Sequence, residues 1–366
     1  MTFRLHFWSH PGCRDESREA SFRGWKRGKD VQQFGFKYFV GRIPLIIVTG
    51  AAGFIGSCTV SKLNQMGKRN ILAVDSLNTT EKWQNLRHLQ FMDYLDKSQL
   101  FEFLATEPLL DAVIHLGACS ATTERDAGYL MENNYRYSLR LAQHCYSRGI
   151  RFIYASSAAT YGDGNQGYDD RDDSSYLRSL KPLNMYGYSK HLFDIQAQQR
   201  GWIDAMVGLK FFNVYGPNEY FKGDMTSVIF KAFGQILEQG KVRLFKSYKD
   251  GFQDGEQLRD FVYVKDVVEA IHFFLENPKV NGLFNLGSGK ARSFKDLAIA
   301  TFQAMGRPVN IEFIEMPEVL RGKYQYFTEA KISKLRATGY ARPFHSLEEG
   351  ISDYVRNYLA CDQASF

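Results

Sequence analysis

The fold of this chain is decided by the stretch from residue 45 to residue 56, which reads LIIVTGAAGFIG. A short apolar run that ends in glycine, such as residues 45–50, is typical of a buried parallel strand. Residues 54–66 then have the pattern of a helix, and residues 71–75 that of a second strand. The stretch therefore predicts a strand, a glycine-rich turn and a helix, the beginning of a βαβ unit.

The same alternation continues beyond this unit. Residues 112–117, 151–157 and 205–212 predict further strands, a long helix is expected over 126–148, and another helix begins near Tyr186. Strands that alternate with helices indicate a parallel sheet with helices on both faces. The predicted fold class is α/β, a Rossmann-type doubly wound parallel sheet with a smaller mixed α/β domain that follows it.

Four segments are expected along the chain. Residues 44–212 would form a dinucleotide-binding Rossmann domain and residues 213–359 a substrate-binding domain, with some exchange of chain between them. Residues 360–366 would be a tail. Residues 1–43 hold nine Lys/Arg and four Asp/Glu, whereas the rest holds 37 basic and 36 acidic residues. This first segment is predicted to be a basic extension outside the core, and the nearly neutral body argues against nucleic-acid binding.

Composition narrows the class of protein. The chain has 366 residues, of which 44% are hydrophobic, enough for a large core. No apolar run approaches the ~18 residues of a membrane span, which predicts a soluble protein. The five cysteines are scattered without zinc-site spacing, which predicts a reducing compartment and no structural metal.

The glycine-rich turn predicts a dinucleotide site. Gly50, Gly53 and Gly56 permit a tight turn, close approach of the backbone to a pyrophosphate, and close packing of helix on strand. Asp75, at the end of the second strand, suits a ribose diol. Asp75 alone favours NAD, whereas Lys82 could reach the 2′-phosphate of NADP, so the residues leave both cofactors open.

A second group of residues predicts catalysis by proton transfer. Tyr186 and Lys190 lie four residues apart on one helical face, and Ser157 stands at the end of a predicted strand, where ligands bind in open parallel sheets. We expect the Lys190 ammonium and an oxidised nicotinamide to lower the pKa of Tyr186. Tyr186 could then accept a hydroxyl proton as a hydride leaves, while the Ser157 hydroxyl holds the developing carbonyl.

With these residues the chain resembles the extended short-chain dehydrogenase/reductases, which act mostly on nucleotide sugars. Their landmarks are matched by NVYGP at 213–217, RDFVYV at 259–264 and FNLG at 284–287. Four longer segments are similar to one subfamily, the ADP-L-glycero-D-manno-heptose 6-epimerases. They are GACSATTE at 117–124, KPLNMYGYSK at 181–190, EYFKGDM at 219–225 and YQYFT at 324–328.

The resemblance implies an isomerase of lipopolysaccharide inner-core synthesis. Such an enzyme oxidises the C6 alcohol of ADP-D-glycero-D-manno-heptose with bound NADP, lets the ketone reorient, and returns the hydride to the other face. Inversion needs proton transfer on both faces, so a second acid/base group is expected beside Tyr186. The resemblance assigns this role to Lys222. It also implies a cytoplasmic homo-oligomer, commonly a pentamer.

The resemblance also implies the lining of both sites. The cofactor would contact Gly50, Gly53, Phe54, Ile55, Gly56, Asp75, Ser76, Lys82, Lys97, Leu116, Gly117, Ala118, Cys119, Ser120, Asn133, Lys190, Val214 and Lys222. The ADP-heptose would contact Ser157, Asn213, Asp224, Lys231, Phe245, Lys246, Ser247, Tyr248, Arg259 and Tyr324. Asp224 and Lys231 stand where the family usually has Ser and His, and the stretch 249–258 is longer than in the shortest members.

Three other functions would need only part of this residue pattern, or residues that the chain lacks. A UDP-galactose 4-epimerase or another nucleotide-sugar epimerase would keep Tyr186, Lys190 and Ser157 but would not need Lys222. A sugar 4,6-dehydratase needs an acidic pair beside the site, and residues 158–160 offer none. A binding module that senses NAD(P) without catalysis would not need the intact Tyr/Lys/Ser set.

Overall fold

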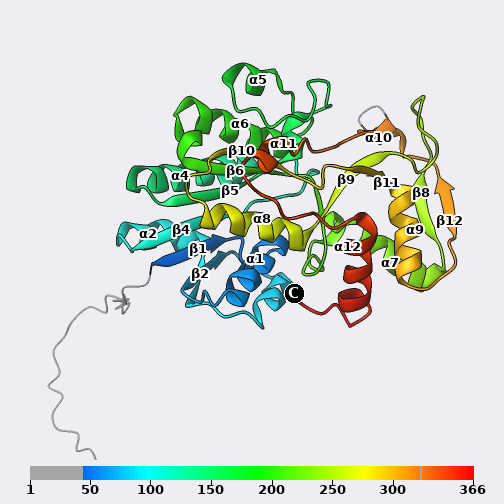
Figure 1. The fold of residues 1–366 in the computed structure, drawn as a ribbon, viewed down its shortest axis with the longest axis horizontal. Coiled ribbons are helices and arrows are strands. Elements are labelled where there is room, and N and C mark those ends of the chain that lie inside the picture. Colours follow the sequence, from blue (N-terminus) through cyan, green and yellow to red (C-terminus); the bar gives the residue numbers. More distant parts are fainter. Residues whose placement is uncertain (1–43, 322–323) are drawn as a thin grey trace, which may run out of the picture. The chain divides into compact units, whose positions relative to one another are not determined.

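The computed structural model describes residues 44–321 and 324–366, so the predicted basic extension, residues 1–43, lies outside the described residues. Its largest element is a seven-stranded sheet in which every neighbouring pair is parallel (Figure 1). The strand order is β10-β6-β5-β4-β1-β2-β3. The strands are β1 (Leu45–Thr49), β2 (Ile71–Asp75), β3 (Asp93–Asp96), β4 (Leu110–His115), β5 (Arg151–Ser157), β6 (Met206–Phe211) and β10 (Gly282–Leu286).

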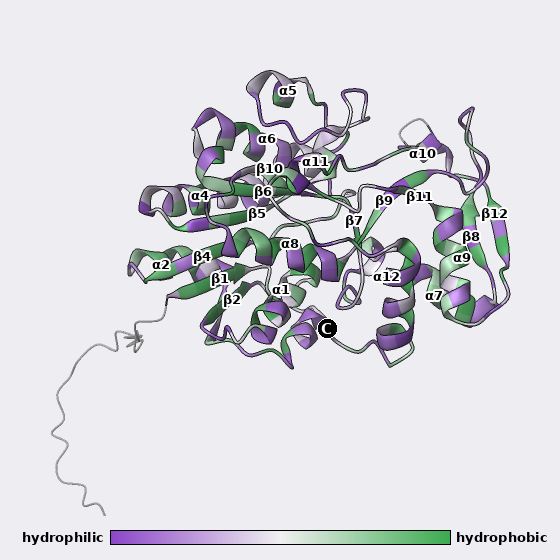
Figure 2. Ribbon diagram, in the orientation of Figure 1, coloured by the Kyte–Doolittle hydropathy of each residue, from purple (hydrophilic) through white to green (hydrophobic). Residues whose placement is uncertain are grey.

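Both faces of this sheet are covered by helices, as strand β1 illustrates. Leu45 and Ile47 pack into a core shared with α2, α4 and α6, whereas Ile46 and Val48 pack into a core shared with α1 and α8. Successive side chains of a strand point to opposite faces, so an unbroken apolar strand supplies both cores. Figure 2 shows hydrophobic residues concentrated on the central strands, with flanking helices of mixed character.

The helices have the following bounds. They are α1 (Phe54–Gln65), α2 (Leu100–Ala105), α3 (Ala127–Leu130), α4 (Tyr137–Arg148), α5 (Ser174–Ser179), α6 (Met185–Gln199), α7 (Val228–Gln239), α8 (Val264–Glu276), α9 (Phe294–Ala304), α10 (Glu318–Arg321), α11 (Ser333–Ala337) and α12 (Leu347–Tyr354). A π-helical segment, η3 (Met131–Arg136), joins α3 to α4, so the predicted helix over 126–148 is continuous but locally widened. No helix in the described ranges is both long and apolar enough to cross a membrane.

The second half of the chain builds two small sheets and also returns to the large one. β7 (Asn213–Tyr215), β9 (Leu258–Tyr263) and β11 (Ala291–Ser293) form one sheet, and β8 (Val242–Phe245) pairs with β12 (Ile311–Ile314). Between β9 and β11 the chain places α8 against α1 and adds β10 beside β6. Residues from the predicted substrate domain thus complete the dinucleotide-binding sheet.

The α/β fold class predicted from sequence is confirmed. The strands and helices expected between residues 45 and 212 occur within a few residues of their predicted ends. Strand β3 was not predicted, because its sequence DYLD is too polar to read as a buried strand. Helix α6 begins at Met185 because the Asn184 side chain caps it, accepting a hydrogen bond from the Gly187 amide at 2.8 Å.

Candidate active site

The glycine-rich turn between β1 and α1 is shaped by contacts that exclude side chains. Gly50 has a left-handed φ of 69°, and a Cβ there would lie 2.7 Å from the Gly117 Cα. A Cβ on Gly56 would lie 1.9 Å from the Gly50 carbonyl oxygen. Gly53 precedes α1 without a side-chain cap, so the first amides of the helix are available to an anion. This cradle fits a dinucleotide pyrophosphate.

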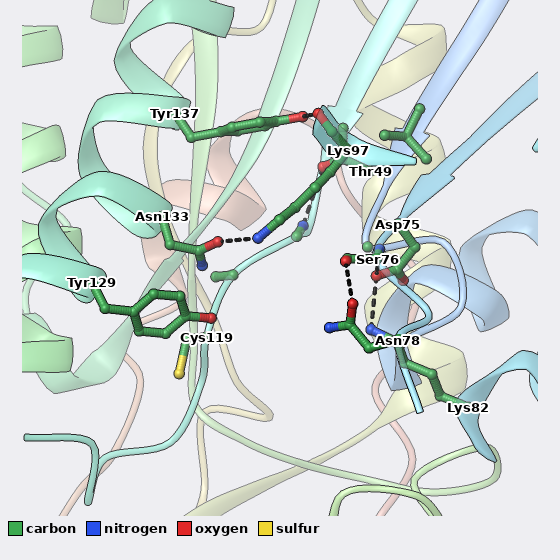
Figure 3. A pocket seen from close by; sticks show the side chains of 14 residues that line it. Thr49, Asp75, Ser76, Asn78, Lys82, Lys97, Cys119, Tyr129, Asn133 and Tyr137 are labelled. Atoms are coloured by element: carbon green, nitrogen blue, oxygen red, sulfur yellow. Dashed lines mark hydrogen bonds and ion pairs between the residues drawn. The ribbon is translucent and has the colours of Figure 1, made fainter. Parts of the chain in front are cut away.

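A pocket opens beside this turn, at the carboxyl ends of β1, β2 and β4 (Figure 3). Nine of the residues expected at the cofactor line it, namely Gly50, Asp75, Ser76, Lys82, Lys97, Gly117, Ala118, Cys119 and Asn133. Asp75 accepts hydrogen bonds from the Ala52 amide at 2.9 Å and the Ser76 amide at 2.7 Å, and pairs with the Lys82 ammonium at 2.8 Å. Lys82 is therefore held at the carboxylate and is not a free surface lysine.

The π-helical segment η3 forms the opposite wall of this pocket. Asn133 accepts a hydrogen bond at 2.6 Å from the Lys97 ammonium, which reaches across from the end of β3 (Figure 3). Asn134 accepts from the amide of Cys119 and donates to its carbonyl, each at 2.9 Å. The widened turn lets adjacent residues 133 and 134 both point inward, as π-bulges often do at functional sites.

Sequence reasoning missed five residues that line the pocket: Thr49, Val74, Asn78, Tyr129 and Tyr137. Tyr129 and Tyr137 lie four residues before and after Asn133, so the helical spacing could have found them. Conversely, Leu116 and Ser120 border the pocket loop without lining it, and Ser120 is exposed.

Tyr186, Ser157 and Lys190 come together where β5 ends against α6. The Ser157 hydroxyl lies close enough to the Tyr186 phenol to lower its pKa. Lys190 is buried and donates to the Ala155 carbonyl at 2.8 Å. Burial lowers the pKa of Lys190 to about 8, against the opposing charge of Asp194.

The pKa of the Tyr186 phenol is set mainly by its burial. Burial raises the pKa of Tyr186, and the hydrogen bond from Ser157 only partly offsets this effect. The Lys190 ammonium, four residues along the same helix, donates to the Ala155 carbonyl. Without a bound nicotinamide the protein groups therefore keep the phenol protonated, and the lowering expected from Lys190 together with an oxidised nicotinamide stays a prediction.

Lys222 lies beside the helix that follows the glycine-rich turn. Its ammonium is 5.1 Å from the centre of the Phe54 ring, at the first residue of α1. Burial lowers the pKa of Lys222, while the carboxylate of Glu219 opposes the shift. Ile55 and Val214 pack nearby, against the core cluster that contains Phe54. An amine with a lowered pKa beside a cofactor cradle suits proton transfer.

The residues expected at the substrate fall into two groups, one whose members pack against each other and one whose members are more exposed. Arg259 is buried on β9, with its guanidinium 5.2 Å from the Tyr324 ring, and Phe245 packs edge-on against the same ring at 6.4 Å. Burial lowers the pKa of Arg259 and raises that of Tyr324. An arginine framed by aromatic rings can bind a diphosphate and an adjacent base.

The remaining expected substrate residues are more exposed. Lys231 donates at 2.7 Å to the Asp224 carbonyl, so these two unusual positions contact each other. Lys246 pairs with Glu315 at 2.7 Å on the surface. Ser247 forms hydrogen bonds within its own loop. The guanidinium of Arg321 lies over the Tyr248 ring. Asn213 is exposed at the start of β7.

Comparisons with known proteins agree with this geometry. Residues 46–287 match the NAD dependent epimerase/dehydratase family. The ADP-L-glycero-D-manno-heptose-6-epimerase of Nitratidesulfovibrio vulgaris is 57% identical over 319 residues, covering 86% of this chain and 98% of that protein. The crystal structure of the enzyme of that name from Helicobacter pylori is 27% identical, with a TM-score of 0.71, covering 86% of this chain and 96% of that one.

A further solved structure bears on the cofactor. The UDP-glucose 4-epimerase of Thermus thermophilus, solved in complex with NAD, is 26% identical with a TM-score of 0.67, and the match covers 85% of this chain and 97% of that one. Both the family and this structure indicate a nicotinamide dinucleotide cofactor. This chain belongs to the NAD dependent epimerase/dehydratase family and, within it, to the ADP-L-glycero-D-manno-heptose-6-epimerases.

Proposed function

We propose that this chain epimerises ADP-D-glycero-D-manno-heptose at C6 to give ADP-L-glycero-D-manno-heptose, a precursor of the lipopolysaccharide inner core. The observation that carries the proposal is a pair of candidate proton-transfer groups, one near the pocket residue Cys119 and one at the first residue of α1. Tyr186 on α6 lies near Ser157, the last residue of β5, and Lys222 lies over Phe54. Relatives of the same name at 57% identity support the choice of substrate.

Tyr186 and Ser157 serve one face of the sugar carbon in this proposal. The Ser157 hydroxyl would hold the C6 oxygen while the phenol exchanges its proton. Bound NADP supplies the hydride acceptor and, when oxidised, a positive charge beside the site. That charge would lower the pKa of Tyr186, which the protein groups alone hold above its ordinary value.

Lys222 serves the other face. Because inversion leaves the hydroxyl on the opposite side of C6, a single fixed phenol cannot reach both proton positions. The lowered pKa of Lys222 makes its ammonium a better proton donor than an exposed lysine. A UDP-galactose 4-epimerase would not need this second group, which favours the heptose reaction over that alternative.

Arg259 and Tyr324 would anchor the ADP portion of the substrate. A buried guanidinium donates two parallel hydrogen bonds to a diphosphate, and Tyr324 can add a third from its hydroxyl. Phe245, Tyr248, Lys246, Ser247, Asn213, Asp224 and Lys231 would complete the lining. The sugar could then turn at C6 while the nucleotide stays bound.

We propose NADP as the preferred cofactor. The Lys82 ammonium neutralises Asp75, the carboxylate that would otherwise repel a 2′-phosphate. Ser76 and Asn78 line the same end of the pocket and bond to each other at 3.1 Å (Figure 3). Their hydroxyl and amide groups can donate hydrogen bonds to that phosphate.

Product analysis by NMR tests the proposed reaction. The protein is incubated with ADP-D-glycero-D-manno-heptose, and with UDP-galactose in a parallel sample. We expect a mixture of the two C6 epimers with no net change in NADP, and no reaction of UDP-galactose. Turnover of UDP-galactose alone would reject the heptose assignment, and reaction of neither sugar with NADP bound would favour a binding module.

The assembly and its location are proposals on family grounds. We propose a cytoplasmic homo-oligomer, and specifically a pentamer, as the resemblance to the epimerase subfamily implies. Light scattering after size-exclusion chromatography gives the particle mass directly, and a monomer at micromolar concentration would contradict this part of the proposal.

A further inference from the structure

The last described residues, 360–366, fold back on the loop that leads to Lys222. Asp362 and Gln363 both have positive φ values, 50° and 58°, so the chain reverses its direction there. A left-handed conformation costs roughly 1 kcal/mol or more at a residue other than glycine, so the contacts that follow must stabilise it. Figure 1 shows the end of this segment beside α1.

Two hydrogen bonds join this segment to the Lys222 loop. The Tyr220 hydroxyl donates to the Ala364 carbonyl at 2.8 Å. The Phe366 amide donates to the Asn218 side-chain oxygen at 3.0 Å. The half-buried Phe366 ring packs at the edge of the core cluster that contains Phe54. The segment therefore contacts the residues on both sides of Glu219.

Asn218 connects the segment to the cofactor turn. It is 1% exposed and has a left-handed φ of 72°. Its side-chain nitrogen donates at 3.0 Å to the Ser57 hydroxyl on α1. Asn85 donates to the Asn218 carbonyl at 3.1 Å and to the carbonyl of Ala52, in the glycine-rich turn, at 3.0 Å. Both polar atoms of the Asn218 side chain are engaged, one by α1 and one by Phe366.

Glu219 fixes the other end of the loop. It is fully buried, and its carboxylate accepts from the hydroxyl of Ser227 at 2.7 Å and from the amide of the same residue. The Lys222 amide then donates to the Glu219 carbonyl at 3.1 Å, closing a turn. This turn directs the Lys222 ammonium over Phe54. The position of the ammonium therefore depends on a loop that residues 364–366 hold from one side.

We propose that residues 364–366 are a positioning segment, which keeps Lys222 at the cofactor turn for proton transfer on one face of the sugar. This inference rests on the proposed function. The contacts of these residues lead to Asn218 and Tyr220, on either side of Glu219, so we expect their main effect to be on Lys222.

Loss of the segment should separate oxidation from inversion. In one C6 epimer the hydroxyl proton passes to the Tyr186 phenolate while the C6 hydride passes to the oxidised nicotinamide, giving ketone and reduced cofactor. That half-reaction does not use Lys222. The other epimer needs Lys222 as its proton acceptor, and a displaced amine would slow only this half-reaction.

The experiment compares the full chain with a chain ending at Gln363 and with Tyr220→Phe, which removes one hydrogen bond and leaves the loop otherwise intact. Tyr146→Phe on the exposed face of α4 is the matched control. Reduced nicotinamide is followed by absorbance with each epimer, and epimer conversion by NMR. We expect conversion to fall about tenfold or more in the shortened chain, and less in Tyr220→Phe. One epimer should still reduce the cofactor at close to the full-chain rate, with KM unchanged. Equal losses with both epimers, or unchanged conversion, would overturn the proposal.

A second readout needs no substrate. The reactivity of the Lys222 amine towards an acylating reagent, measured by mass spectrometry with NADP bound, should rise several-fold in the shortened chain as the loop loosens. Unchanged labelling of Lys222 would also overturn the proposal. If instead the full chain converts neither heptose, the proposed function fails, and the labelling result still decides whether the segment holds the loop.

Discussion

The buried ion pair between Asp194 and Lys210 gives the sharpest stability prediction. Both side chains have no exposed surface, and their charged atoms lie 2.8 Å apart. Asp194 also accepts from the hydroxyls of Tyr154 at 3.0 Å and Ser156 at 2.7 Å. In Asp194→Asn the Lys210 ammonium would keep its burial and lose its counter-charge. Removing one partner of a buried pair costs about 3–5 kcal/mol, so we expect the free energy of unfolding to fall by that amount.

Urea unfolding at a fixed NADP concentration measures this loss. The double variant Asp194→Leu with Lys210→Met removes both charges and should recover most of the stability, because the desolvation cost disappears with the pair. Glu107→Gln, which removes the exposed partner of Arg148, is the control and should cost less than about 1 kcal/mol. The reasoning would be refuted if Asp194→Asn lowered the free energy of unfolding by less than about 1 kcal/mol. It would also be refuted if the double variant lost as much stability as the single variants Asp194→Leu and Lys210→Met together.

Four further changes test the site. Tyr186→Phe should lower epimerisation about 10²- to 10⁴-fold while the Kd for NADP, measured by calorimetry, stays within about threefold; full turnover would remove Tyr186 from the mechanism. Lys82→Met should weaken NADP binding about tenfold and NAD binding far less, and equal losses would contradict the proposed 2′-phosphate contact. Gly56→Ala places a Cβ 1.9 Å from a backbone oxygen and should lower Tm and abolish NADP binding, whereas Gly234→Ala in α7, where a Cβ meets nothing within 4 Å, should leave binding unchanged. Because the folded pKa of Lys190 is about 8, below its ordinary value, its ammonium is lost as pH rises through about 8; kcat/KM should fall over that range, and Lys190→Arg should move the fall to higher pH.

Local sequence was sufficient for the parts of the site that a short segment builds. The turn at 50–56 is set by steric contacts that only glycine permits, and Asp75 follows from the length of one βαβ unit. The helix that carries Tyr186 follows from a cap and a regular pattern. Apart from the approach of Gly117 to Gly50, these features depend on neighbours within about 25 residues, which a sequence pattern can represent.

Features that depend on distant partners could not be predicted in this way. The contacts of Ala364 and Phe366 join residues almost 150 positions apart, and nothing in the short stretch 360–366 indicates them. The extent to which burial, a property of the whole fold, raises the pKa of Tyr186 in the protein without a cofactor was likewise not evident from the sequence. The inward direction of Tyr129 and Tyr137 depends on the π-helical segment between them.

The position of β10 has a consequence for synthesis of the protein. Strand β6 can pair with β5 as soon as residue 211 is made, but its other edge is covered only by β10, residues 282–286. A chain still on the ribosome therefore presents an unpaired hydrophobic edge while some 70 further residues are translated. Open strand edges are templates for pairing between molecules, so neighbouring nascent chains on one messenger would be prone to aggregate during this interval. A chaperone that shields β6 until β10 emerges would raise the yield of folded enzyme.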